Sequence, residues 1–334
     1  MVVPAGIDDP ARPSGGNTYD RRVRNGLAAE GWAVHVHEVL APRAALVAAL
    51  PEIPDGSLVL IDGLVASPAP DVLVTESRRL RLVALMHMPL GGAEPDQREG
   101  AMLSEVAAVV ATSAWARRVL LELYSLPGDR VHVAEPGVDA ADLAAGTATG
   151  GSLLSVAAVI PGKGHDVLVD ALATLNGHGW SCLCVGSLER DATFVEGVRR
   201  RAFDGGMNGR MRFSGALPEE DLARSYSAAD LLVLPSRSET YGMVVTEALA
   251  RGLPVVAADV GGVPEAMGHG ADGTRPGVLV RPGDPAALGD ALRAWLEDAD
   301  LRRRLRRAAR ERRELLVDWS TTTSAVADVL ARAA

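Results

Sequence analysis

Two carboxylates flank a turn that leads into an amphipathic helix in the second half of the chain. The segment from Pro235 to Pro254 reads P-S-R-S-E-T-Y-G-M-V-V-T-E-A-L-A-R-G-L-P, with Glu239 in the turn and Glu247 in the helix. The first turn of a helix has unpaired amides and a partial positive charge, which favour a phosphate. Eight helical residues would rise roughly 12 Å, so the two carboxylates can reach opposite ends of a ligand with central phosphates. A nucleotide diphosphate-sugar has this layout, whereas two solvated glutamates on a strand-turn-helix unit are the alternative.

The elements around this segment are predicted from its apolar pattern. The run L-L-V-L at 231–234 has the composition of a buried strand that feeds the turn. Gly252 and Pro254 are predicted to end the helix. The residues that can cap its start are Ser238, Thr240 and Gly242.

Apolar strand-like runs alternate with helical periods along the whole chain, which predicts an α/β fold with parallel sheets. A segment rich in Ala, Gly and Thr at 142–152 is the expected linker. The strands are predicted near residues 2–3, 33–39, 58–62, 82–86, 106–111 and 131–134 before the linker, and near 153–159, 181–185, 211–213, 231–234, 255–258 and 278–280 after it. Two doubly wound domains are therefore expected, with ligands at the carboxyl ends of the strands.

The composition limits the class of protein. The chain has 334 residues, 48% of them hydrophobic and 23% charged, which suits a globular protein of two domains. A net charge of −9 argues against nucleic acid as a partner. Cys182 and Cys184 are predicted to share one buried strand face, and no further cysteine completes a thiolate metal site. No signal peptide or membrane span stands out, so a cytoplasmic location is expected.

The chain resembles the retaining glycosyltransferases of family 4, which have the GT-B architecture of two Rossmann-like domains facing across a cleft. The resemblance covers nearly the whole chain and rests on three segments: the E-x7-E motif of Glu239 and Glu247, R-M-R-F-S-G-A-L-P-E-E-D-L from Arg210, and D-V-G-G-V-P-E from Asp259. It implies an N-terminal acceptor-binding domain at 1–142 and a C-terminal donor-binding domain at 143–317. The helix at about 318–334 is expected to pack back on the first domain.

The resemblance implies roles for individual residues. Glu247 would accept hydrogen bonds from the ribose of the donor, and Glu239 would hold hydroxyls of the transferred sugar. Gly242 and Met243 would offer backbone amides to the diphosphate, and Lys163 would contribute a cation. The expected donor-binding set is Gly15, Gly16, Lys163, Glu239, Thr240, Tyr241, Gly242, Met243 and Glu247, and the expected catalytic set is His87, Glu239 and Lys163.

Two of these assignments lie in the first domain. Gly15 and Gly16 match the family's first loop, where glycine lets the backbone approach a phosphate closely, although a plain turn is the alternative. His87, in L-M-H-M-P after an apolar run, matches a histidine that faces the sugar in many family members. A neutral imidazole there can hydrogen-bond a sugar hydroxyl or the acceptor, and a satisfied core histidine is the alternative.

The chain departs from the family pattern at the start of the second domain. The segment V-A-A-V-I-P-G-K-G-H-D keeps Lys163, but Ala158 stands where the family usually has an arginine on the diphosphate. A leaving diphosphate needs its developing charge offset. Arg237 and Arg190 are candidates to replace the missing cation, and lost turnover is the alternative. The first strand, Val2-Val3, is also shorter than is usual in the family. A start codon further upstream is therefore expected.

Two further patterns receive ordinary explanations. Asp298-Ala299-Asp300 is a formal D-x-D metal motif, but it lies between two predicted helices far from the donor motif, so chance is favoured. The Arg-rich helix at 302–313 can sit on anionic lipid, but a solvated face is favoured over peripheral membrane contact. No metal or other cofactor is expected.

The sequence therefore predicts a retaining transfer of a hexose-like sugar from a nucleotide diphosphate-sugar to a hydroxyl acceptor, with UDP favoured as the nucleotide. Two alternatives remain: a nucleotide-sugar binding protein that has lost catalysis, suggested by Ala158, and a GT-B epimerase that acts on the donor itself.

Overall fold

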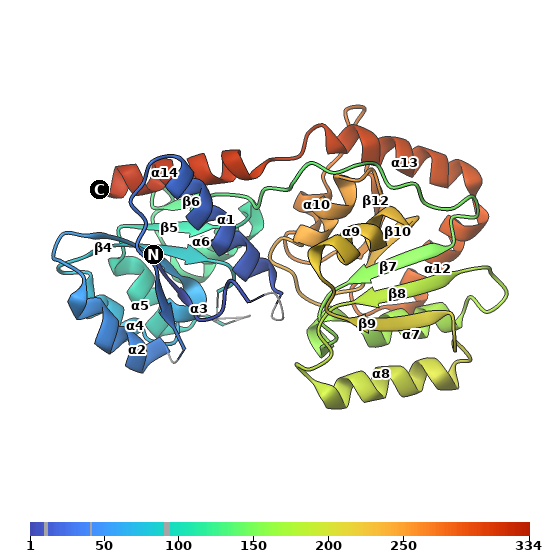
Figure 1. Ribbon diagram of the computed structural model, residues 1–334, viewed down its shortest axis with the longest axis horizontal. Helices are drawn as coiled ribbons and strands as arrows, with labels where there is room; N and C mark the ends of the chain where they lie inside the picture. Colours follow the sequence, from blue (N-terminus) through green and yellow to red (C-terminus); the bar gives the residue numbers. More distant parts are fainter. Residues whose placement is uncertain (10–12, 41, 90–93) are drawn as a thin grey trace. The chain divides into compact units, whose positions relative to one another are not determined.

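The computed structural model describes residues 1–9, 13–40, 42–89 and 94–334, and they form two compact units (Figure 1). Unit 1 comprises Met1–Gly137 and Val317–Ala334, and unit 2 comprises Val138–Leu316. The boundary lies a few residues before the expected one at 142/143. In the described part of the chain, no helix has the length and apolar character needed to cross a bilayer.

Unit 1 is built on one six-stranded parallel sheet with the strand order β2-β1-β3-β4-β5-β6. Its strands are β1 (Val2–Pro4), β2 (His37–Val39), β3 (Leu58–Asp62), β4 (Arg81–Met86), β5 (Ala108–Ala111) and β6 (Val131–Val133). Its helices are α1 (Gly15–Ala29), α2 (Pro42–Ala49), α3 (Gly63–Ala66), α4 (Pro70–Glu76), α5 (Gln97–Glu105), α6 (Ala114–Tyr124) and α14 (Trp319–Ala333), with a 3-10 turn, η1 (Leu50–Glu52). The order reverses at β1 and β3, where a doubly wound sheet forms its ligand crevice.

Unit 2 is built on a second six-stranded parallel sheet with the order β12-β11-β10-β7-β8-β9. Its strands are β7 (Ser152–Val156), β8 (Ser181–Val185), β9 (Met211–Gly215), β10 (Leu231–Leu234), β11 (Val255–Ala258) and β12 (Gly277–Val280). Its helices are α7 (His165–Ala173), α8 (Ala192–Asp204), α9 (Glu219–Ser227), α10 (Met243–Leu249), α11 (Val263–Met267), α12 (Pro285–Glu297) and α13 (Ala299–Arg313), with a 3-10 turn, η2 (Pro161–Lys163). This is the Rossmann order, and its switch point lies between β7 and β10.

Both sheets are buried on two faces, which explains the unbroken apolar runs in the sequence. In β10, Leu231 and Val233 enter one core cluster while Leu232 and Leu234 enter the other. Cys182 and Cys184 both lie buried on the same side of β8, as the sequence predicted. The predicted fold class, α/β with two doubly wound parallel-sheet units, is confirmed.

Several predicted elements differ in detail; for example, the strand expected at 153–159 is observed at Ser152–Val156. The strand expected over residues 33–39 is confined to His37–Val39, because β1 offers only three residues to pair with it. At the start of α10, Gly242 is the N-cap with φ +93°, and no side chain caps the helix, so the expected capping by Ser238 and Thr240 is wrong. Because α10 begins at Met243, Glu247 is its fifth residue and Glu239 lies outside it, so the 12 Å estimate does not apply.

The C-terminal helix α14 packs against α1 in unit 1. Its buried face contributes Val326, Val329 and Leu330 to a core cluster that also contains Tyr19 and Val23 of α1. The chain therefore returns to unit 1 after completing unit 2. Arg81 of β4 donates to the carbonyl of Ala334, which ties the end of the helix to the sheet.

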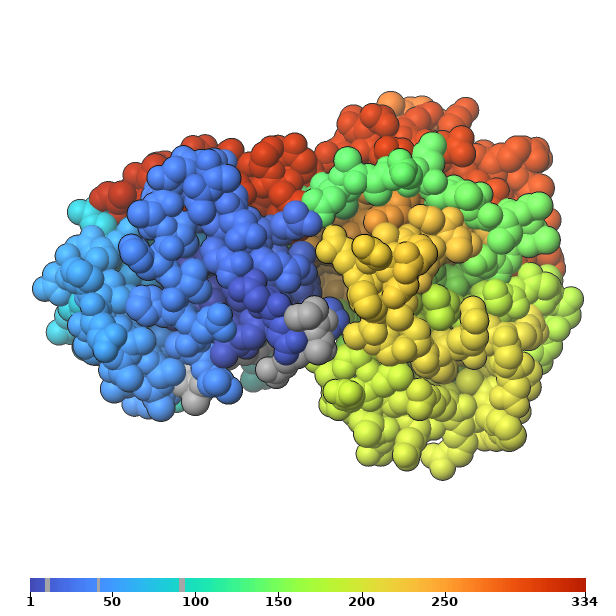
Figure 2. Space-filling model, viewed as in Figure 1, coloured from blue at the N-terminus to red at the C-terminus, as the bar shows by residue number. Residues whose placement is uncertain are grey.

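The segment before β7 is extended but attached to unit 2. It forms a strip of green atoms over the surface of that unit (Figure 2). The amides of Thr147 and Ser152 donate to the two carboxylate oxygens of buried Asp230, at 2.7 and 2.9 Å. Arg306 of α13 donates to the same carboxylate at 2.8 Å. Asp230 thus fixes the linker, the first strand and the last helix of unit 2 to each other.

Candidate functional site

Lys163 and Glu239 form a close ion pair in unit 2, although 76 positions separate them. Lys163 Nζ lies 2.7 Å from Glu239 Oε1, and Ser236 Oγ donates to the same oxygen at 2.8 Å. Lys163 closes the turn after β7, whereas Ser236 and Glu239 belong to the turn after β10. Because β7 and β10 are hydrogen-bonded neighbours, the two turns meet at the switch point of the sheet.

Around this ion pair, glycines let the backbones of three loops come close together, namely the loops after β7, β10 and β11. A Cβ on Gly164, where φ is +68°, would lie 2.1 Å from the carbonyl oxygen of Pro235. A Cβ on Gly261, where φ is +55°, would lie 1.6 Å from the carbonyl oxygen of Glu239. The amide of Gly262 donates to that same oxygen at 3.2 Å. From the sequence, D-V-G-G-V-P-E was only a match to a family segment. In the structure, its two glycines pack against the backbone of Glu239.

Arg237, one candidate to replace the arginine absent at Ala158, is already engaged by its own unit. Its guanidinium binds both oxygens of Asp166, at 2.8 and 2.7 Å, and the carbonyl of Pro161 at 2.7 Å. This pairing lowers the pKa of Asp166 and raises the pKa of Arg237. Arg237 therefore joins the turns after β7 and β10, while Arg190 is exposed on the loop after β8.

Glu247 is held by groups that the sequence did not single out. Tyr226 of α9 donates its hydroxyl to Glu247 Oε2 at 2.8 Å, and the Tyr226 ring is fully buried. The guanidinium of Arg251 lies 4.7 Å from the centre of that ring and donates to the Glu247 carbonyl at 2.8 Å. Burial raises the pKa of Glu247, while the Tyr226 hydrogen bond and the Arg251 charge act in the opposite direction.

The remaining unit 2 positions surround the start of α10. Gly242 caps the helix through its backbone, and Met243 is the first helical residue. Tyr241 is 4% exposed and packs in the core with Val263 of α11, so its side chain serves the fold. Thr240 is half-buried, and a Cβ on Gly262 would lie 2.3 Å from its carbonyl oxygen.

The expected unit 1 residues Gly16 and His87 are neighbours. Ser14 caps α1 by accepting from the amide of Asn17 at 3.1 Å, which makes Gly15 and Gly16 its first two residues. A Cβ on Gly16 would be in ordinary contact, 3.6 Å, with the His87 ring. His87 directly follows β4, at the carboxyl edge of the sheet.

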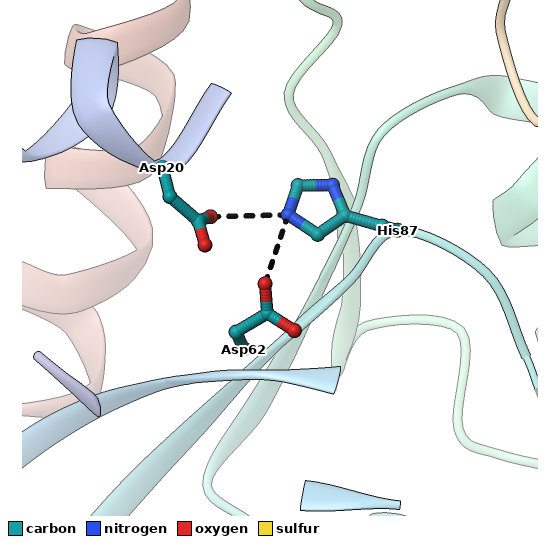
Figure 3. A group of neighbouring side chains, drawn as sticks. All are labelled: Asp20, Asp62 and His87. Atoms are coloured by element: carbon teal, nitrogen blue, oxygen red, sulfur yellow. Dashed lines mark hydrogen bonds and ion pairs between the residues drawn. The ribbon is translucent and has the colours of Figure 1, made fainter. Parts of the chain in front are cut away.

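His87 faces two carboxylates that the sequence reading missed, Asp20 of α1 and Asp62 at the end of β3 (Figure 3). Its Nε2 lies 3.0 Å from Asp20 Oδ1 and 3.4 Å from Asp62 Oδ2. Burial alone would lower the pKa of His87, but the two aspartates raise it to about 10. The two aspartates therefore favour a protonated ring over the neutral imidazole expected from the sequence. Nothing in the local pattern around Asp20 or Asp62 signalled this contact.

These three side chains also have the composition of a metal site, since one ligand atom from each lies within 4.8 Å of the others. The D-x-D pattern has a different explanation. Asp298 caps α13 by accepting from the amides of Asp300 and Leu301, and Asp300 pairs with Arg303. Both aspartates thus contribute to the start of α13.

The family comparison matches the part of the chain that carries the Lys163, Glu239 and Glu247 arrangement. Residues 149–312 fit the family model described as "Glycosyl transferases group 1". Unit 2 is a group 1 glycosyltransferase domain. The predicted resemblance to glycosyltransferases is confirmed.

Curated relatives of this chain carry glycosyltransferase names. A D-inositol 3-phosphate glycosyltransferase of Nocardia farcinica is 37% identical over 235 residues, which cover 64% of this chain and 50% of the relative. The same-named protein of Jonesia denitrificans is 34% identical over 260 residues, covering 71% and 60%. The sulfoquinovosyl transferase SQD2 of Arabidopsis thaliana is 40% identical over 114 residues, covering 34% and 22%. The chain spans about half the length of the first relatives it matches.

Solved structures share the fold over the full length. HepE of Anabaena, solved in complex with UDP and glucose, has a TM-score of 0.76 at 19% identity, with 99% of this chain and 98% of that chain covered. Sucrose-phosphate synthase of Thermosynechococcus elongatus has a TM-score of 0.77 at 22% identity, with the same coverage. At these identities the likeness shows the fold alone.

Proposed function

We propose that this protein is a retaining glycosyltransferase that moves a hexose-like sugar from a nucleotide diphosphate-sugar, with a UDP-sugar favoured, to a hydroxyl acceptor. The observation that carries the proposal is the Lys163–Glu239 pair at the switch point of unit 2, with Tyr226 holding Glu247 on the same unit. A cation, a carboxylate for the sugar and a carboxylate for the ribose are the groups that such a donor requires.

In this proposal the Lys163–Glu239 pair is the ligand-free arrangement. When the donor binds, Lys163 turns to the diphosphate, and Glu239 accepts hydrogen bonds from the sugar hydroxyls while Ser236 still donates to it. A compact ammonium suits a diphosphate that gathers charge as it leaves. Gly242 and Met243 offer backbone amides to the same phosphates.

The transfer itself exchanges one bond at the anomeric carbon. The bond from that carbon to the donor phosphate oxygen breaks, a bond to the acceptor oxygen forms, and the acceptor proton passes to the leaving phosphate oxygen. The charge on the leaving diphosphate is offset by Lys163. No metal ion is assigned a part in this proposal.

Binding and product analysis together test the proposal. Calorimetry with UDP, GDP and ADP identifies the nucleotide, and the matching sugar donors are then incubated with candidate acceptors. D-inositol 3-phosphate is the first acceptor to try, because several relatives are named for it. NMR of the product should show the anomeric configuration of the donor. Inversion would refute the retaining mechanism, and a failure of all three nucleotides to bind would refute the donor site.

A second candidate function is nucleotide-sugar binding without transfer. It is favoured by Ala158 in place of a family arginine and by the commitment of Arg237 to Asp166. Tight donor binding with no glycosylated product across the acceptors would support it. A donor converted to its epimer would instead identify an epimerase.

A further inference from the structure

Two aspartate side chains from separate elements of unit 1 converge on one ring nitrogen of a histidine. Asp20 lies in α1, Asp62 ends β3 and His87 follows β4, so none is close to another in sequence. Both aspartates are almost fully buried, with 0% and 1% exposure. In Figure 3 each directs a carboxylate oxygen to Nε2 of His87, while the second ring nitrogen points away from both.

The positions of the Asp20 and Asp62 carboxylates determine the protonation state of the His87 ring. Nε2 lies within reach of both, so it must carry a proton that they can accept, and their negative charges favour a proton on the second nitrogen as well. Burial raises the pKa of Asp20 to about 7, whereas the hydrogen bond and charge of His87 outweigh burial and lower the pKa of Asp62. His87 and Asp62 therefore form a buried ion pair, with Asp20 as a second, titrating partner.

The ring is also fixed in orientation. Tyr19 meets it edge to face, with ring centres 5.2 Å apart, and the Tyr19 hydroxyl donates to the Ala134 carbonyl at 2.9 Å. Gly16 at the start of α1 is also close to the ring, since a Cβ there would lie 3.6 Å from Cδ2 of His87. Among the described residues, the titratable groups that face His87 are thus Tyr19 and Asp20 from α1 and Asp62 from β3. The aspartates hold Nε2, so Nδ1 is the nitrogen left to meet a ligand.

We propose that Asp20 and Asp62 are positioning residues that keep His87 as a fixed imidazolium, so that its Nδ1–H donates to a negatively charged oxygen of the substrate. The inference rests on the proposed transferase function for the identity of the substrate. It goes further by excluding His87 as a general base, because a ring protonated on both nitrogens accepts no proton. This agrees with the proposed passage of the acceptor proton to the leaving phosphate oxygen.

The charge state is tested on the free protein, without any substrate. The Cε1–H signal of His87 is assigned as the one missing from the spectrum of His87→Gln, and is then followed by NMR from pH 5 to 11. We expect the wild-type signal to titrate near 10, and Asp62→Asn to lower the midpoint by at least about one unit toward the ordinary value of 6.5. Asp20 titrates beside the ring near pH 7, so the decisive observation is the ring at higher pH: a wild-type ring that is already neutral at pH 8 would overturn the inference even if the enzyme transfers sugar.

The positioning role is tested by the alkaline limb of the activity profile. Asp20→Asn and Asp62→Asn should move the loss of kcat to lower pH, with UDP affinity unchanged. Asp8→Asn is the matched control, because Asp8 pairs with Arg24 on α1, at 2.7 Å, and not with His87. An alkaline limb that stays in place in both site variants would refute the role.

A divalent cation is the rival occupant of the same three side chains, and it predicts a different result. Mn²⁺ added to the wild-type protein should leave the His87 signal sharp if the ring is an imidazolium. Selective broadening of that signal at micromolar Mn²⁺, abolished by Asp20→Asn, would replace the imidazolium with a metal centre.

Discussion

Replacing Tyr226 with Phe removes one hydroxyl and tests whether Glu247 is held ready for the nucleotide. The hydroxyl donates to Glu247 Oε2 at 2.8 Å from a ring that is 1% exposed, so the shape of the core is kept. A hydrogen bond to a charged group contributes about 1.5–3 kcal/mol. Part of this stabilisation is regained when water or Arg251 donates a hydrogen bond to the Glu247 carboxylate. We therefore expect the free energy of unfolding to fall by about 1–2 kcal/mol.

The same change should weaken nucleotide binding. Without its partner, Glu247 samples other rotamers, and we expect the Kd for UDP to rise by about 3–10-fold, since 1.4 kcal/mol corresponds to tenfold. The lost bond also lowered the pKa of Glu247, so this pKa rises further in the variant. Because the ribose contact needs the ionised carboxylate, the deficit relative to wild type should grow as the pH is lowered.

Unit 1 offers a matched control for this variant. Tyr124 donates its hydroxyl to Glu99 Oε2, so Tyr124→Phe deletes the same kind of bond in the other unit. Calorimetry with UDP and urea unfolding are performed on both variants. We expect Tyr124→Phe to lose stability while binding UDP normally. An unchanged UDP affinity in Tyr226→Phe, or an equal loss in both variants, would refute the reasoning.

The remaining predictions concern the ion pair, the lysine, the linker and metal dependence. Glu239→Gln should retain UDP binding but lower turnover, because Glu239 is assigned to the sugar; loss of UDP binding with normal turnover of bound donor would contradict this. Lys163 is the only lysine of the chain, so amine-selective acylation should abolish activity in step with its modification, with protection by UDP; full activity in completely acylated protein would remove Lys163 from the site. Asp230→Ala should lower the free energy of unfolding by about 2–3 kcal/mol, because it leaves the amides of Thr147 and Ser152 unpaired, and an unchanged urea midpoint would show that the linker is held otherwise. Transfer activity should survive EDTA, and a full loss restored by Mn²⁺ would disprove metal independence.

The sequence alone determined the two doubly wound units. Runs such as L-L-V-L at 231–234 are apolar on both faces, and only a parallel sheet covered on two sides buries them fully. The E-x7-E spacing and the single lysine also identified Glu239, Glu247 and Lys163 as the groups to examine, since their residue types suit a diphosphate between hydroxyls. Local rules worked only in part at the start of α10, where Gly242, one of the three expected caps, is the N-cap and neither Ser238 nor Thr240 caps the helix.

Only the tertiary structure decided which of these groups meet. Lys163 reaches Glu239 because β10 lies beside β7 in the sheet, and strand order is a property of the whole unit that no local window encodes. Tyr226 reaches Glu247, and Asp20 and Asp62 reach His87, across elements that lie far apart in the chain. The charge of His87 follows from those contacts, because a pKa depends on the groups that burial brings together and not on sequence neighbours.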